Sequence, residues 1–169
     1  MKLLGALAVM AACVSAGVRL NRERAEELAL LRELCRGVER VHAELATSLR
    51  PLPELCAQLG GELSGAAGAF FRSLAESMPA LSQQSFFELW QSAAGRSLSA
   101  LAPEERSALL QLGQALGRFE LQEQLGACER CRESLADAAA ERKERSRNER
   151  KLTLALSGAA GALLCLLLL

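Results

Sequence analysis

Residues 28–52 read LALLRELCRGVERVHAELATSLRPL. Apolar or large side chains recur here at alternating spacings of three and four residues: Leu28, Leu31, Cys35, Val38, His42, Leu45, Leu49 and Leu52. This spacing places one stripe along one face of a helix, so we expect a single helix that buries the stripe. We interpret His42, which lies on the stripe, as a partly buried core residue rather than a metal ligand.

The helix is expected to continue toward the N-terminus, because residues 21–27 contain neither proline nor glycine. It then enters residues 3–18, LLGALAVMAACVSAGV, which carry no charge. A second uncharged run, LTLALSGAAGALLCLLLL, occupies residues 152–169. Helices of this length span about 24–27 Å, close to the thickness of a bilayer core. We therefore predict transmembrane helices at 1–20 and 152–169, separated by a domain at 21–151.

Basic residues flank both apolar runs on the side of the central domain. Arg19, Arg22 and Arg24 follow the first run, and six basic residues between 142 and 151 precede the second. Because basic residues next to a span stay in the cytoplasm, we expect the central domain to be cytoplasmic, with both termini across the membrane. The alternative is a secreted or lipid-anchored bundle released from an N-terminal signal segment. Residues 14–16 would then be a small-residue cleavage site and residues 10–13 a lipoprotein-like box.

Prolines, glycines and capping residues divide the central domain into further helices. The predicted boundaries are a break at Pro51 and Pro53, a short helix over 52–59 stopped by Gly60-Gly61, a helix capped by Ser64 that ends before Pro79, a capping box at Ser85–Glu88, a start at Pro103 and a last long helix from Leu121. Glu104 and Glu105 should stabilise the positive end of the helix that begins at Pro103. Since no stretch shows strand alternation, we predict an all-α helical bundle.

The few aromatic residues indicate where the core lies. The chain has one tryptophan and no tyrosine. Trp90, together with Phe86 on the same capped helix, is expected in the core, because large aromatic side chains dominate small cores. Cys128 and Cys131 are expected to pack on a buried stripe of the last helix together with Leu121, Leu125 and Leu135. A closed zinc site needs four ligands, and one helical turn with two cysteines does not supply them.

The sequence lacks the patterns of an enzyme. No glycine-rich loop is followed by lysine and a hydroxyl residue, as a phosphate-binding loop would be. The one histidine lies on a core stripe, so no nucleophile, base and acid can be assembled around it. The formal net charge is zero, which gives no overall field for nucleic acid. We therefore expect no catalytic residue, no cofactor, no metal and no nucleic-acid partner.

Gly117 interrupts two strongly helical stretches, and Glu120 stands at the start of the last one, where a carboxylate meets the positive end of the helix dipole. A glycine that closes a helix can adopt a left-handed conformation that other residues adopt at a cost. We hypothesise that this junction is an elbow that shapes the surface offered to partners. A plain helix cap without a partner role is the alternative.

Several stretches of the chain are distinctive: Pro-Leu-Pro-Glu at 51–54, Phe-Phe-Glu-Leu-Trp at 86–90, Leu-Gly-Gln-Ala-Leu-Gly at 112–117 followed by Glu120 and Gln124, and the glycine-containing tail at 158–169. In this order they resemble the stage III sporulation protein AB family of endospore-forming bacteria. Glu120 stands where the family usually has aspartate. The resemblance marks Gly117, Glu120 and Gln124 as a family pattern at a helix junction, the candidate interaction residues.

The resemblance implies a non-enzymatic membrane subunit with a cytoplasmic domain similar to the platform proteins of type II secretion and type IV pilus machines. It implies a place in the mother-cell membrane that faces the forespore. The expected partners are a separate secretion-type ATPase and other membrane subunits of a transenvelope complex, with a homo-oligomer as a further possibility.

Overall fold

The structure, a computed structural model, describes the backbone of residues 2–47, 50–118 and 120–168 and the side chains of residues 22–47, 50–117 and 120–147. Its elements are α1 (Lys2–Thr47), α2 (Leu52–Glu62), α3 (Gly65–Ser77), the 3₁₀-helix η1 (Met78–Ser82), α4 (Phe86–Ser97), α5 (Pro103–Arg118) and α6 (Leu121–Leu168). The described backbone contains helices and turns but no strand, which confirms the all-α prediction.

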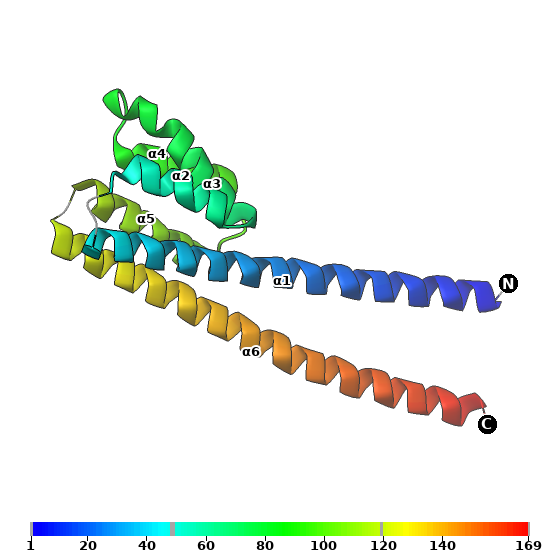
Figure 1. Ribbon diagram of the computed structural model, residues 1–169. Helices are drawn as coiled ribbons and strands as arrows, with labels where there is room; N and C mark the ends of the chain where they lie inside the picture. Colours follow the sequence, from blue (N-terminus) through cyan, green and yellow to red (C-terminus); the bar gives the residue numbers. More distant parts are fainter. Residues whose placement is uncertain (1, 48–49, 119, 169) are drawn as a thin grey trace.

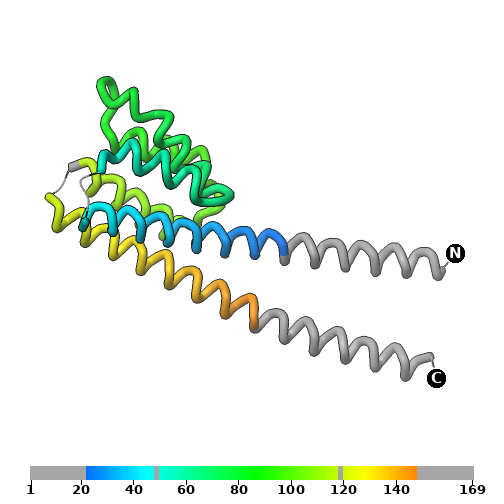
Figure 2. The backbone as a smooth tube through the Cα atoms, viewed as in Figure 1, coloured from blue at the N-terminus to red at the C-terminus, as the bar shows by residue number. Residues whose placement is uncertain are grey.

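The two long helices α1 and α6 run antiparallel and side by side, and the shorter helices α2 to α5 pack at one end of this pair (Figure 1). Within the described part of the chain (coloured in Figure 2), α5 packs along α6 and α3 contacts α1. At the other end of the described region, residues 24–28 of α1 face residues 142–146 of α6. Both long helices therefore leave the bundle on the same side.

The core is built around Trp90, which is 1% exposed and touches three phenylalanine rings. Phe70 and Phe71 meet the indole edge to face, at centroid distances of 4.9 and 6.4 Å. Phe86 is half-buried and tilted against it at 5.7 Å. Edge-to-face aromatic pairs add to the free energy gained from burial, so this cluster holds α3 and α4 together.

The buried face of α1 is wider than the predicted stripe and displaced from it. Its buried large side chains are Leu30, Leu31, Leu34, Val38 and Val41. Of the predicted stripe, Leu28, Cys35, His42 and Leu45 are only half-buried. The reason is that α1 packs against two neighbours, α6 and α3, whereas a single stripe is expected for a helix with one neighbour.

The prediction that Gly60-Gly61 ends the second helix is wrong, because α2 continues through both glycines to Glu62. A Cβ at Gly60 would lie 2.9 Å from Cα of Arg72, so this glycine permits the close approach of α2 to α3. Ser64 is the N-cap residue of α3, but its side chain makes no capping bond. Its backbone N–H instead donates to Oε2 of Glu33 at 3.1 Å, which ties the α2–α3 turn to α1.

Other local predictions are confirmed. The capping box at Ser85 is present, with the Glu88 N–H donating to Oγ of Ser85 and the Ser85 N–H donating to the Glu88 carboxylate. Pro103 begins α5 and α3 ends before Pro79. Among the described residues, no helix is long and apolar enough to cross a membrane. The predicted spans at 1–20 and 152–169 lie outside the residues whose side chains the structure describes.

Candidate interaction site

The predicted junction residues lie around the turn that joins α5 to α6. Gly117 is in the last turn of α5, Glu120 directly precedes α6, and Gln124 is in its first turn. The backbone N–H of Gln124 donates to the carbonyl of Glu120 at 3.1 Å, so the hydrogen-bond ladder of α6 starts at Glu120. Glu120 is exposed and Gln124 is half-buried. The Glu120 carboxylate thus lies at the positive end of the α6 dipole, where a partner can reach it.

The conformation expected for Gly117 is wrong. Gly117 lies within α5, and the only described residue with a left-handed backbone is Gly65, with φ at +60°. A Cβ at position 117 would lie 3.4 Å from Cδ1 of Phe86, which is an ordinary contact. Gly117 is therefore not a left-handed elbow, and α5 has room for a Cβ at this position.

The glycine that the packing requires is Gly113, one turn earlier in the same motif. A Cβ there would lie 2.3 Å from Cδ1 of Trp90, a distance that no side chain tolerates. The indole packs against α5 at this point, and its Nε1 donates to the carbonyl of Leu109 at 2.9 Å. Sequence reasoning missed this role, although the first glycine of Leu-Gly-Gln-Ala-Leu-Gly was its visible signal.

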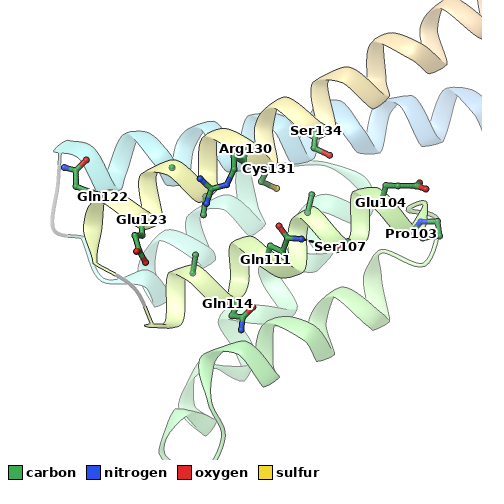
Figure 3. Close-up of a pocket in the computed structure, with 14 residues that line it drawn as sticks. Pro103, Glu104, Ser107, Gln111, Gln114, Gln122, Glu123, Arg130, Cys131 and Ser134 are labelled. Carbon is green, nitrogen blue, oxygen red and sulfur yellow. Dashed lines mark hydrogen bonds between the residues drawn. The ribbon is translucent and has the colours of Figure 1, made fainter.

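A groove of about 1140 Å³ runs between α5 and α6, beside the junction. Figure 3 shows its lining, in which small and apolar residues are joined by amide, hydroxyl and charged side chains: Glu104, Ser107, Gln111, Gln114, Gln122, Glu123, Arg130 and Ser134. Amides both donate and accept hydrogen bonds, so the groove can recognise the polar surface of a protein.

A buried ion pair joins α5 to α6 beyond this groove. Nη2 of Arg142 donates to Oε1 of Glu105 at 2.6 Å, and the Glu105 side chain is only 6% exposed. The other carboxylate oxygen of Glu105 accepts the backbone N–H of Ala102 at 2.9 Å. Nη1 of Arg142 lies 3.9 Å from Oε2 of Glu27, so the guanidinium also reaches α1. The sequence assigned Glu105 only to the helix dipole, because nothing local points to a partner 37 residues away.

Cys128 and Cys131 of α6 pack in the core of the bundle. Cys128 and Cys131 are buried, and burial raises the pKa of their thiols to about 11 and about 12. Of the residues predicted to share their stripe, Leu135 is buried, Leu125 is half-buried and Leu121 is 46% exposed. In the described part of the chain, no group of three His, Cys, Asp or Glu side chains could hold a metal.

Comparison with known proteins places the chain in a family. The family model described as stage III sporulation protein AB matches residues 2–169. A solved structure of a stage III sporulation protein AB (SpoIIIAB) superposes with a TM-score of 0.66 at 18% sequence identity, covering 73% of this chain and 98% of that chain. At that identity the likeness supports a shared fold. A comparison with curated proteins gives no match.

Proposed function

Because the chain belongs to the stage III sporulation protein AB family and thus acts in sporulation, we propose that it is a non-enzymatic platform subunit of a transenvelope complex between mother cell and forespore. In this proposal the bundle at 21–151 is cytoplasmic, and helices at 1–20 and 152–169 anchor it in the mother-cell membrane that faces the forespore. Its partners would be a secretion-type ATPase and other membrane subunits.

The observation that carries the proposal is the antiparallel pairing of α1 and α6. Residues 24–28 and 142–146 lie side by side, and from there each helix runs toward one of the uncharged apolar runs. Both runs therefore start from the same side of the bundle, as two anchors in one membrane must. The basic residues at 19–24 and 142–151 then fall on the same side of that membrane, which is the arrangement expected for a cytoplasmic domain.

The non-enzymatic part of the proposal is supported by the use of the polar and reactive groups in packing. The thiols of Cys128 and Cys131 have raised pKa values, which leave little thiolate to act as a nucleophile near neutral pH. The Trp90 Nε1 and the Glu105 carboxylate are both occupied by hydrogen bonds within the core.

The surface offered to partners is proposed to be the α5–α6 groove together with Glu120 at the junction. The groove is lined by residues of α5 and α6, and its amide side chains suit a polar protein interface. In this proposal the long helices leave one end of the bundle toward the membrane. A cytoplasmic ATPase could approach the opposite end. This placement makes groove variants the direct test of partner binding.

The first experiment tests membrane placement. The full chain, with a cysteine added next to residue 1 or residue 169, is produced in sporulating cells, and labelled with a membrane-impermeant thiol reagent before and after permeabilisation. Resistance to alkaline extraction and labelling of both ends without permeabilisation are expected. A mature chain that begins near residue 13 or 17 and leaves the membrane would instead support a secreted or lipid-anchored bundle.

The second experiment tests the partner surface by crosslinking and affinity capture from the same cells. Gln114→Arg places a charge in the groove, and Gln83→Arg places the same change on an exposed turn outside it. We expect Gln114→Arg to lose the captured ATPase and to lower spore yield, while Gln83→Arg keeps both. Equal capture by the two variants would remove the groove from the proposed interface.

A further inference from the structure

A cavity of about 340 Å³ lies between α1 and α6, at the end of the described region from which both helices leave the bundle. Three guanidinium groups, a hydroxyl, a carboxylate and two apolar side chains line it: Arg24, Arg142, Arg145, Ser146, Glu27, Ala25 and Leu28. Positive side chains thus outnumber negative ones around it by three to one. The cavity is separate from the α5–α6 groove and shares no lining residue with it.

The guanidiniums differ in how firmly they are held. Arg142 is fixed by its 2.6 Å contact with Glu105, and its Nη1 is buried without a hydrogen-bond partner. Arg145 contacts Glu141 at 2.8 Å, but both side chains are about 70% exposed, and such surface pairs contribute little free energy. Arg145 can therefore turn toward a better acceptor. Guanidinium groups bind phosphate oxygens through two parallel hydrogen bonds, which a lone lysine does not provide.

How far the cavity lies from the membrane follows from the membrane placement in the proposed function, on which this inference rests. Arg24 lies four residues beyond position 20, and Arg145 lies seven residues before position 152. At 1.5 Å per residue, these are helical distances of about 6 and 10 Å from the ends of the proposed spans. The head-group layer of each leaflet is roughly 5–8 Å thick. Extended arginine side chains in the cavity thus reach the level of the lipid phosphates.

The surrounding sequence adds to the same electrostatic attraction. Residues 19–27 and 142–151 together carry nine basic and five acidic side chains, although the whole chain is neutral. Basic pockets between helices on the cytoplasmic side of a membrane are suited to anionic head groups. Ala25 and Leu28 give the cavity an apolar wall next to its charged one, as a bound phospholipid requires.

We propose that this cavity binds the phosphate of an anionic phospholipid head group from the cytoplasmic leaflet. Arg145 and Arg24 would hold the phosphate oxygens, and the Ser146 hydroxyl would donate to them. Arg142 would supply positive charge while it remains paired with Glu105. Inorganic phosphate shares this chemistry, so the test must separate the two sources.

The full chain is reconstituted into vesicles of phosphatidylcholine alone or with 30 mol% phosphatidylglycerol or cardiolipin, and the lipid retained per chain after gentle detergent extraction is measured by native mass spectrometry. The site variant is Arg24→Gln with Arg145→Gln. The control variant is Lys143→Gln with Arg147→Gln, which removes the same charge from exposed positions outside the cavity, on either side of Arg145 in the same helix. Inorganic phosphate at 10 mM in neutral vesicles forms the second arm.

The wild-type chain and the control variant should retain anionic lipid, and the site variant should retain at least about fivefold less than the control, the factor expected for one lost basic contact. Equal losses in both double variants would show diffuse attraction by the basic stretch and would overturn the site. Binding of inorganic phosphate that displaces the lipid equally well would also overturn the lipid assignment. Alkaline extraction is carried out first, before retained lipid is measured. Release of the wild-type chain from vesicles in that step would contradict the proposed membrane placement itself.

Discussion

Glu105 and Arg142 are 37 residues apart in sequence, yet Nη2 of Arg142 lies 2.6 Å from Oε1 of Glu105 at the point where α5, α6 and α1 meet. The pair connects the bundle to the helix that leads toward the C-terminal apolar run. Replacing a buried pair by apolar residues is often neutral for stability, whereas removing one partner leaves an uncompensated charge. The contact therefore fixes the relative position of the three helices more than it adds to the free energy of folding.

Glu105→Met alone is expected to lower the free energy of unfolding by about 2–3 kcal/mol, somewhat below the range for fully buried pairs, because the Arg142 side chain is 25% exposed. The double change Glu105→Met with Arg142→Met should recover most of this loss. Chemical denaturation of the full chain in detergent, arranged as a double-mutant cycle, measures the coupling. Additive single and double effects would mean that the two residues do not interact.

Gly113 and Gly117 provide a matched pair in one helix. Gly113→Ala would place Cβ 2.3 Å from the Trp90 ring and should cost about 1–3 kcal/mol through displacement of the indole. Gly117→Ala meets only an ordinary contact, so it should be neutral or stabilising by up to about 1 kcal/mol, because alanine favours the helix. Thermal unfolding of both variants checks this. An equal loss of stability in both variants would show that α5 tolerates a methyl group at neither position, and would contradict the ordinary contact expected at position 117.

The buried thiols should make stability depend on pH in the alkaline range. Burial raises the pKa of Cys131 from 9.0 to about 12 and that of Cys128 to about 11, so the folded state binds these protons more tightly than the unfolded state. Their contribution is complete below pH 9 and is lost as the pH rises toward 12. The chain has no tyrosine, but burial also raises the pKa of Cys56 to about 12 and raises the pKa of Cys35, so these two thiols add to the same loss of stability.

Denaturation curves at pH 8, 9 and 10 should therefore show falling stability, with a smaller slope in the Cys131→Ala variant. The buried thiols should also resist alkylation by iodoacetamide at pH 8 until the chain is unfolded. Rapid alkylation of Cys131 in the folded chain would contradict its raised pKa. Stoichiometric zinc in the purified protein would contradict the packing role of both cysteines.

The sequence predicts this fold well where a boundary depends on local chemistry. The Ser85–Glu88 capping box and the proline at 103 each complete their interactions within one turn, and both begin helices as expected. Prediction from the sequence fails where a helix boundary depends on the neighbouring helix. Gly60 would end an isolated helix, but in α2 it faces the backbone of Arg72, and the helix continues.

The same distinction applies to the candidate site. The position of Glu120 and Gln124 at a helix junction could be predicted, because the break between the two helical stretches is visible in the local sequence. The sequence alone could not assign the contact of Gly113 with Trp90, since that contact depends on how α4 crosses α5. The pairing of Glu105 with Arg142 likewise exists only after α5 and α6 have packed.

Trp90 allows the core to be tested directly, because it is the only tryptophan in the chain. Its indole is 1% exposed, stacks edge to face on Phe70 and donates to the Leu109 carbonyl. The native fluorescence maximum should therefore be that of a buried indole and shift to longer wavelength on unfolding. Trp90→Ala should cost about 3–5 kcal/mol, which approaches the whole stability of a typical domain. Trp90→Phe keeps part of the ring packing but leaves the Leu109 carbonyl without its side-chain donor, so its loss should be smaller. A native maximum already at the exposed position, or a Trp90→Ala chain that unfolds at the wild-type temperature, would place this residue outside the core.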